Sequence, residues 1–290
     1  MLVNLNEILN NARKNKYAIP AFDASDYRMI KAIIEVAEEL KAPVILMGLP
    51  SDLSNEQFDY LSKDLIGLAK AAKVPVCVHL DHATDFELIK KAIDQGYSSV
   101  MIDGSSLPLK DNIKITKQVV DYAHRYNVTV EAELGHVGDG IVGSSEKSAK
   151  GNSGHDNVYT DPKEMEYFIK QTGVDCLAVS FGTSHGVYKT KPELQIDLLK
   201  KLNEISTVPL VVHGGSGTPD DQMKEAIENG ITKVNIFSEI LSAFFGEMKR
   251  QLNELDNMSL WPSAAYKRPI EAMKEIVREK FYLCKAENRV

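Results

Sequence analysis

The chain has 290 residues and a mass of 32.2 kDa, and its composition is 43% hydrophobic and 26% charged. These proportions are typical of a soluble folded enzyme and exclude a disordered or fibrous chain. The formal net charge of −7, without any basic stripe, argues against nucleic-acid binding, because neutralising phosphates requires clustered Lys and Arg.

The cysteines and the first residues of the chain predict a reduced, cytoplasmic protein. Cys77, Cys176 and Cys284 are odd in number and include no C-x-x-C pair, and residues 1–20 lack the apolar stretch of a signal peptide. No segment approaches the roughly 18 apolar residues that cross a bilayer, and the acidic balance offers no patch for anionic lipids. We therefore expect no membrane partner.

Eight short runs rich in β-branched residues follow one another along the chain, each bounded by Gly, Pro or Asp. They cover 18–23, 43–48, 75–81, 98–104, 129–135, 176–182, 209–215 and 233–238. Because they are apolar almost throughout, they are typical of parallel strands buried on both faces. Stretches with helical spacing lie between them, among them 29–40, 85–96, 113–126, 162–173 and 219–230.

This alternation predicts an α/β fold in which residues 1–290 form a single-domain (β/α)8 TIM barrel. The barrel is expected over about 18–254, and a C-terminal helical extension over about 255–290, packed outside the barrel or against a neighbour. A doubly wound open sheet is the alternative, although the first strand-to-helix turn, 23–28, lacks the glycines of a dinucleotide site. The long polar run 136–161 is interpreted as a lid over the site, with an inert insertion as the alternative.

Polar residues gather where the predicted strands end, which is where barrel enzymes place their active sites. Five of the seven histidines lie at or just past such ends. The residues concerned are His79, Asp81, His82, Asp103, Glu133, His136, His185, His213, Asn235 and Ser238. Three histidines from different strands, with one coordination position left open, are typical of a catalytic zinc. We predict that His82, His185 and His213 form this trio.

The other polar residues at the strand ends have less specific expectations. Asp81 is the candidate general acid/base, with a helix cap or the orientation of a metal ligand as its alternatives. Asp103 and Glu133 either hold a second cation or orient the metal ligands. His79 and His136 are expected to form hydrogen bonds or to pack.

The segment HGGSGTPDD at 213–221 resembles an anion-binding loop, in which glycines let backbone N–H groups approach a phosphate. With Asn235 and Ser238, it follows the seventh and eighth strands, where barrels commonly bind phosphate. Lys189 either adds a cation to this pocket or is an ordinary surface lysine.

Taken together, these stretches resemble the class II, zinc-dependent ketose-bisphosphate aldolases, which include fructose- and tagatose-1,6-bisphosphate aldolases. The similar stretches run in order from 18 to about 240: AFDASD, KAPVIL, VPVCVHLDHATDFELIKKAIDQGYSSVMIDGSSLP, VEAELGHVG, TGVDCLAVSFGTSHGVYK, VPLVVHGGSG and ENGITKVNIFSE. The combination of HLDH, SHG and HGGSG is the most specific part of the resemblance.

The resemblance implies a reaction and a site. The reaction is reversible cleavage of a ketose 1-phosphate or 1,6-bisphosphate to dihydroxyacetone phosphate and an aldehyde through a zinc-stabilised enediolate, in carbohydrate metabolism such as glycolysis. Asp81 would move the proton of the C4 hydroxyl, and Asp103 and Glu133 would form an alternate cation site. The phosphate would be held by Gly186, Lys189, Gly214, Gly215, Ser216, Asn235 and Ser238. A monovalent cation and a homodimer or homotetramer are also implied.

The chain departs from the family pattern at several positions that bear on the substrate. Leu49 replaces a usual Ser or Thr, Asp23 stands where Asn is common, and Trp261-Pro262-Ser263 replaces Asp-Pro-Arg, which helps to bind the distal phosphate. We therefore expect a distal group other than a standard 6-phosphate, or a replacement charge from Lys267 and Arg268.

The loop after the fifth predicted strand also departs from the family. Residues 138–141, GDGI, replace Gly-Gly-x-Glu, whose acidic residue shuttles the enediolate proton. Asp139, Glu146 and Asp156 are the candidates for that role.

Three other activities compete with the metal aldolase. A metal-dependent sugar-phosphate epimerase or isomerase would use the same groups, and a non-catalytic accessory subunit would retain the barrel without turnover. A Schiff-base aldolase needs a lysine that projects into the pocket. Lys233 is placed by the sequence at the start of a strand, away from the site.

Overall fold

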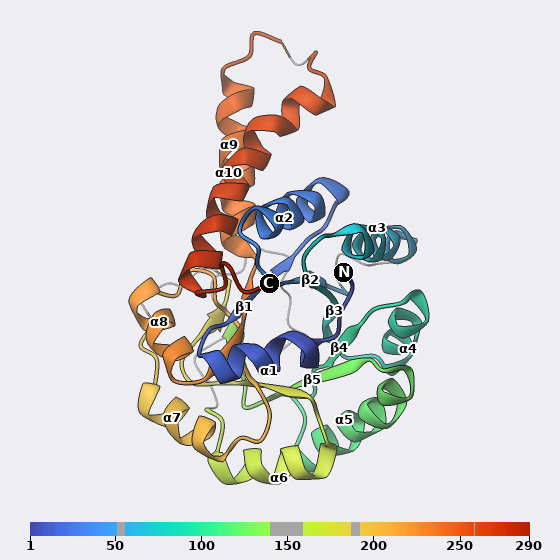
Figure 1. Cartoon of the computed structure of the whole chain (residues 1–290), viewed down its shortest axis with the longest axis vertical. Coiled ribbons are helices and arrows are strands. Elements are labelled where there is room, and N and C mark those ends of the chain that lie inside the picture. The colour runs from blue at the N-terminus through green and yellow to red at the C-terminus, as the bar shows by residue number, and fades with distance from the viewer. Residues whose placement is uncertain (51–55, 140–158, 187–191, 258) are drawn as a thin grey trace.

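The computed structural model describes residues 1–50, 56–139, 159–186, 192–257 and 259–290. Eight parallel strands close a barrel in the order β1-β10-β9-β7-β5-β4-β3-β2 (Figure 1). These strands are β1 (Ile19–Asp23), β2 (Val44–Gly48), β3 (Val76–Ala83), β4 (Ser99–Ile102), β5 (Thr129–Leu134), β7 (Cys176–Val179), β9 (Leu210–Val212) and β10 (Ile231–Ile236). Each lies within or beside one of the eight predicted runs, so the (β/α)8 barrel is confirmed.

Helices surround the barrel, and α1 precedes the first strand. They are α1 (Leu5–Asn15), α2 (Tyr27–Glu39), α3 (Gln57–Ala71), α4 (Phe86–Gln95), α5 (Leu109–Ala123), α6 (Pro162–Thr172), α7 (Ile196–Ile205), α8 (Asp220–Glu228), α9 (Ser238–Asn253) and α10 (Pro262–Leu283). Asp26, Asp85 and Asp161 cap α2, α4 and α6 by accepting backbone N–H groups, and Gly96 and Gly173 end α4 and α6 in the left-handed conformation. Capping chemistry therefore sets these boundaries.

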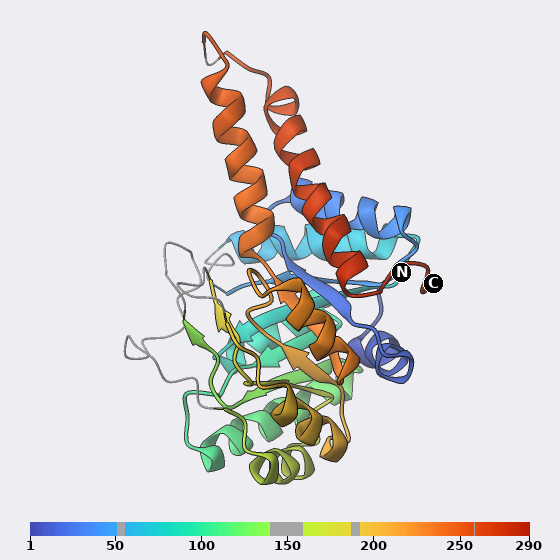
Figure 2. The same cartoon turned by 90° about the vertical axis from the view of Figure 1, so that its left-hand side faces the viewer.

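The C-terminal residues form a helical hairpin that rejoins the barrel. α9 and the first turns of α10 project away from the strands (Figures 1 and 2), and the second half of α10 packs against α2, α8 and β1. Met273, Val277 and Phe281 are fully buried there, and the Phe281 ring lies 5.9 Å from that of Phe22. The expected C-terminal helix is thus present and packs on the outside of the strands, where this half takes the eighth place in the ring of helices.

Two further strands lie at the end of the barrel where the long loops emerge. β6 (Gly138–Asp139) pairs in parallel with β8 (Ser184–His185). Most of the predicted lid, 140–158, lies outside the described residues. Among the helices that the structure describes, none is both long enough and apolar enough to span a membrane.

Candidate active site

The carboxyl end of β3 is irregular, and this irregularity brings two adjacent side chains to the same place. The register between β3 and β4 shifts between Leu80 and Ala83, and His82 has φ = 46°, in the left-handed region. In a regular strand, Asp81 and His82 would point to opposite faces of the sheet. A bulge with one left-handed residue redirects a side chain, and here both residues face the mouth of the barrel.

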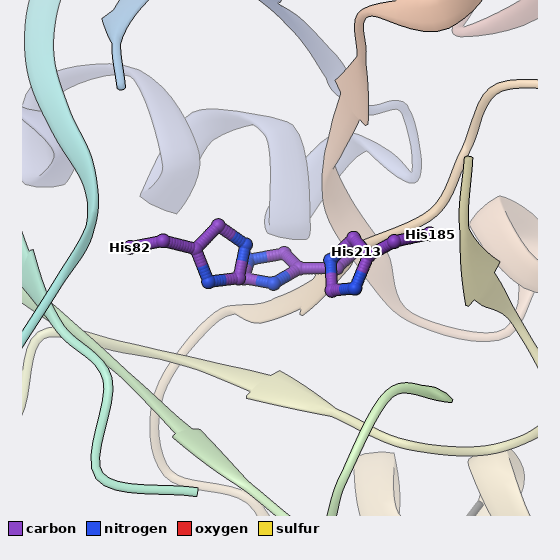
Figure 3. A group of neighbouring side chains, drawn as sticks. All are labelled: His82, His185 and His213. Atoms are coloured by element: carbon purple, nitrogen blue, oxygen red, sulfur yellow. The ribbon is translucent and has the colours of Figure 1, made fainter. Parts of the chain in front are cut away.

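Three imidazoles meet at this mouth (Figure 3). His82 comes from β3, His185 from β8, and His213 follows β9 directly. The ring centroid of His82 lies 4.5 Å from that of His213 and 5.0 Å from that of His185, while those of His185 and His213 are 5.8 Å apart. One nitrogen of each ring lies within 4.8 Å of one nitrogen of both others. The predicted trio is therefore assembled by three separate elements.

The hydrogen bonds of these rings leave one nitrogen of each for a metal ion. Nδ1 of His82 lies 2.9 Å from Asp103 Oδ2, and Nε2 of His213 lies 2.9 Å from Glu131 Oε1. His185 Nε2 is buried and has no hydrogen-bond partner among the described residues, and His213 Nδ1 has the carboxylate of Glu133 3.0 Å away. Imidazole nitrogens that converge from three elements are a donor set that suits Zn²⁺. The residues present thus fit a catalytic metal.

The electrostatics of the site favour a positive charge between the three rings. Burial and the neighbouring rings of His82 and His213 hold the pKa of His185 well below its usual value, so this imidazole is neutral and able to ligate. Burial disfavours the charged form of His82 as well, but Asp81, Asp103 and Glu133 outweigh it and raise its pKa. Carboxylates that stabilise a protonated imidazole also stabilise a metal cation at the same place.

Asp81 is buried beside the trio and is held as a carboxylate. Its two oxygens each accept a 3.3 Å hydrogen bond from Asn235 Nδ2, and His82 Nε2 lies 3.9 Å from Oδ2. Burial opposes ionisation, but the positive charges of His82 and Lys233 lower the pKa of Asp81. An ionised, buried carboxylate next to a metal position has the state that a general base needs.

Asp103 and Glu133 occupy different positions around the trio. Asp103 forms a hydrogen bond with Nδ1 of His82, and it also accepts a hydrogen bond from the N–H of Ser105. Asp103 is thus placed to orient the His82 ring. Glu133 Oε2 lies 3.0 Å from Nδ1 of His213, the nitrogen directed at the metal position. Of the two carboxylates, Glu133 is therefore the one placed to reach a cation.

A family model described as "Fructose-bisphosphate aldolase class-II" matches residues 3–289. The chain belongs to the class II fructose-bisphosphate aldolase family. The resemblance drawn from HLDH, SHG and HGGSG is therefore confirmed, and the protein is an aldolase, a carbon–carbon lyase. Aldolases of this class generally depend on a metal ion, in agreement with the donor set described above.

Solved structures of related enzymes share the whole fold of this aldolase. The YdjI aldolase from Escherichia coli K12 is 32% identical, with a TM-score of 0.87 over 100% of this chain and 99% of that one. A fructose-bisphosphate aldolase from Campylobacter jejuni is 24% identical, with a TM-score of 0.80 over 100% of this chain and 97% of that one. At the latter identity, the similarity supports the fold alone.

The glycine-rich loop of this aldolase needs its glycines because the backbone is crowded. Gly214 has φ = 67°, and a Cβ there would collide with the carbonyl oxygen of Ser184. A Cβ on Gly215 would lie 2.6 Å from the backbone oxygen of Asn235. The loop thus packs closely against the backbones of β8 and β10 and holds them beside His213, in addition to any role in binding phosphate.

Several residues of the predicted phosphate pocket lie within the described residues. Ser238 opens α9, and its buried hydroxyl has no hydrogen-bond partner among them. The N–H of Gly217 donates to Glu239 Oε1 at 2.7 Å, and the hydroxyl of Ser216 accepts from the N–H of Phe237. The N-terminus of α9, which has no side-chain cap, and the Ser238 hydroxyl are therefore the groups beside this loop that suit an anion. Gly186 follows His185 with φ = 80°, whereas Lys189 lies outside the described residues.

Two charged residues inside the barrel were missed as functional candidates. Glu131 and Lys233 are fully buried, and Lys233 Nζ lies 2.9 Å from Glu131 Oε2. Lys233 was expected away from the site, but its amine donates to Asn235, the partner of Asp81. A charged residue in the middle of a predicted buried strand is the signal that identifies both, because buried charges require partners.

The remaining predicted positions are placed as follows. His79 bonds Ser99 at 2.8 Å and is neutral, since burial and Lys233 lower its pKa to about 4. The backbone carbonyl of His136 accepts a hydrogen bond from the Ser180 hydroxyl. Leu49 and Asp23 are buried at the ends of β2 and β1. Glu146, Asp156 and the side chain of Asp139 lie outside the described residues.

Proposed function

We propose that this aldolase reversibly cleaves a ketose 1-phosphate or ketose 1,6-bisphosphate to dihydroxyacetone phosphate and an aldehyde. The observation that carries the proposal is the convergence of His82, His185 and His213 beside the buried carboxylate of Asp81. These three histidines would hold Zn²⁺. Glu133 is the neighbour best placed to join them, and a monovalent cation would assist.

Each protein group has a definite task in this reaction. When bound, Zn²⁺ acts as a Lewis acid that polarises the ketose carbonyl and stabilises the negative charge left when the C3–C4 bond breaks. Asp81 accepts the proton of the C4 hydroxyl and returns it in the direction of synthesis. Asn235 holds the Asp81 carboxylate in place with its amide. The N-terminus of α9 and Ser238 bind the phosphate end of the substrate.

The distal end of the substrate is expected to differ from a standard 6-phosphate. The family arginine is replaced by Ser263 in the first turn of α10, on the projecting hairpin. Arg268 already pairs with Glu247 of α9 and with Glu254, the residue that follows α9, so its charge is compensated within the hairpin. Losing a charge-assisted contact costs roughly 1.5–3 kcal/mol, which favours a substrate with an uncharged distal end.

We further propose a cytoplasmic homodimer or homotetramer. Cys77, Cys176 and Cys284 are unpaired and buried, as in a reducing compartment. Phe245 and Trp261 on the hairpin are 60% and 81% exposed, and such side chains suit a subunit contact. Sedimentation equilibrium measures the assembly directly.

The proposed reaction is tested with purified protein and a panel of ketose 1-phosphates and 1,6-bisphosphates. Dihydroxyacetone phosphate is detected by its reduction in a coupled assay, with and without a chelator. We expect release that the chelator abolishes and that added Zn²⁺ restores. Turnover with an unchanged carbon skeleton would support an epimerase instead, and no turnover across the panel despite bound metal would contradict the proposal.

A further inference from the structure

An ion pair crosses the interior of the barrel below the three histidines. Glu131 stands in β5 and Lys233 in β10, two strands that are not neighbours in the sheet. Lys233 Nζ lies 2.9 Å from Oε2 and 3.1 Å from Oε1 of Glu131, and both side chains are fully buried. Because removing two charges from water is costly, a buried ion pair adds little net stability compared with apolar residues of the same volume. The pair therefore calls for a role other than stabilising the fold.

The glutamate of this pair acts on a predicted metal ligand. Oε1 of Glu131 lies 2.9 Å from Nε2 of His213, and an ionised carboxylate can only accept a hydrogen bond. Nε2 must then carry the proton, which leaves the lone pair of the neutral imidazole on Nδ1. Nδ1 faces the predicted metal position, and the carboxylate 3.0 Å from it, Glu133, is itself a candidate ligand for the ion, whereas Glu131 lies on the opposite side of the ring and is paired with Lys233. Glu131 thus selects the tautomer that can bind a metal.

The lysine of the pair acts on the partner of the proposed base. Lys233 Nζ donates to Oδ1 of Asn235 at 2.7 Å. An ammonium group has no acceptor, so it fixes which end of the Asn235 amide turns toward it. The other end, Nδ2, then donates to both oxygens of Asp81 at 3.3 Å. If the amide were reversed, Oδ1 would face the carboxylate and repel it.

We propose that the Glu131–Lys233 ion pair is a positioning device that sets the metal-binding tautomer of His213 and the orientation of Asp81 at once. This inference rests on the proposed function for the role of Asp81, and on the three-histidine site for the role of His213. Neither Glu131 nor Lys233 touches the substrate in this scheme. Each acts through one hydrogen-bonded neighbour.

Paired double variants test the proposal, because a single substitution leaves an unpaired buried charge and can prevent folding. Lys233→Met/Glu131→Leu removes both charges and the acceptor for His213. Lys233→Met/Glu131→Gln removes the charges but retains an amide oxygen that can accept from His213 Nε2. Thermal denaturation confirms that both variants fold, and titration of the metal-free proteins with Co²⁺ alone measures metal affinity without any turnover.

We expect Lys233→Met/Glu131→Leu, the Leu variant, to bind Co²⁺ about 10- to 100-fold more weakly than the wild type. The affinity of Lys233→Met/Glu131→Gln, the Gln variant, for Co²⁺ should be close to that of the wild type. Both variants lack the contact to Asn235, so kcat of each should fall about tenfold to 100-fold with little change in KM. Unchanged Co²⁺ affinity in the folded Leu variant, or unchanged kcat in both variants, would overturn the proposal. A wild type that binds Co²⁺ but cleaves no ketose phosphate would overturn the proposed function instead, and the Co²⁺ comparison would still decide the role of Glu131.

Discussion

His82 adopts a left-handed backbone conformation, which costs a non-glycine residue about 1–3 kcal/mol. The strain lets two consecutive residues of β3 face the same site, where we propose one as a metal ligand and the other as a base. Asp103 stabilises the arrangement through a 2.9 Å hydrogen bond to the ring. Strain of this kind is typical of functional sites, where the surrounding structure holds a residue in place.

The different roles of the histidines and of Asp81 lead to opposite expectations for two alanine variants. His213→Ala removes one of three ligands and should abolish tight Zn²⁺ binding, whereas Asp81→Ala should retain the metal. Because general-base catalysis contributes about 10²- to 10⁴-fold, Asp81→Ala should lower kcat by that factor. Metal analysis after dialysis, together with the coupled assay, separates the two effects. Full activity in either variant would contradict the site assignment.

A matched pair of glycine substitutions tests whether the loop holds the site together. Gly214→Ala forces a methyl group against the carbonyl of Ser184 and should displace His185 from His213, weakening Zn²⁺ binding by about tenfold or more. Gly246 lies within α9 with nothing near its missing Cβ, so Gly246→Ala should leave binding unchanged and raise stability by about 0.5–1 kcal/mol. Isothermal titration with Zn²⁺ compares them. Equal affinities would refute the locking role.

The helix α10 belongs to the barrel, and adjacent residues near its end test this. Phe281 is fully buried against Phe22 of β1, whereas Tyr282 is 54% exposed. Phe281→Ala should lower the free energy of unfolding by about 3–5 kcal/mol, as expected for a buried aromatic residue. Tyr282→Ala should change it by no more than about 0.5 kcal/mol. Urea denaturation provides both values, and a small effect of Phe281→Ala would show that the barrel folds without α10.

The same helix also contacts the glycine-rich loop, residues 213–221, through a buried lysine. Lys280 contacts Glu239, whose other oxygen accepts the N–H of Gly217. Lys280→Met should raise KM for a phosphorylated substrate about tenfold with little effect on kcat, since a hydrogen bond to a charged group contributes about 1.5–3 kcal/mol.

The control for this prediction lies on the same helix. Lys274 pairs with Glu35 of α2, away from the loop, so Lys274→Met should leave KM unchanged. Steady-state kinetics distinguishes the two variants. If both raise KM equally, the effect comes from loosening α10 rather than from the loop.

The elements themselves were largely predictable, because a parallel strand buried on both faces leaves a continuous apolar run in the sequence. Three features were not. The two-residue strands β6 and β8 are too short to leave a pattern, although one of them carries His185. The amphipathic pattern of α10 indicates an apolar face but not what covers it. The bulge in β3 depends on contacts with β4 that no local pattern records.

At the scale of the whole molecule, the trio was predictable because a barrel brings the carboxyl ends of all its strands to one mouth. Glu131 and Lys233 were missed because the pairing of β5 with β10 across the interior depends on barrel geometry rather than on sequence spacing. A charged side chain within a predicted buried strand was the available signal that each of them has a partner. Arg268 was a candidate for binding the distal phosphate, but in the structure its guanidinium group forms ion pairs with Glu247 and Glu254.

The net charge of −7 constrains how the protein can attract an anionic substrate. An acidic protein repels an anionic sugar phosphate at long range, so the attraction must be local. In the proposed site, a metal ion held by the three histidines and the N-terminus of α9 would supply positive potential for the substrate. A single cation held at the mouth of the barrel would therefore serve both binding and chemistry.

We propose that His82, His185 and His213 together hold one divalent cation beside Asp81. Crystals grown with Zn²⁺ and measured at the zinc absorption edge test it most directly. We predict one strong anomalous peak bonded to His82 Nε2, His185 Nε2 and His213 Nδ1 at about 2.0–2.1 Å, with a coordination position open toward Asp81. A peak at the second group of buried candidate ligands, His79, Asp81 and Glu131, or no peak among the three histidines, would contradict the account.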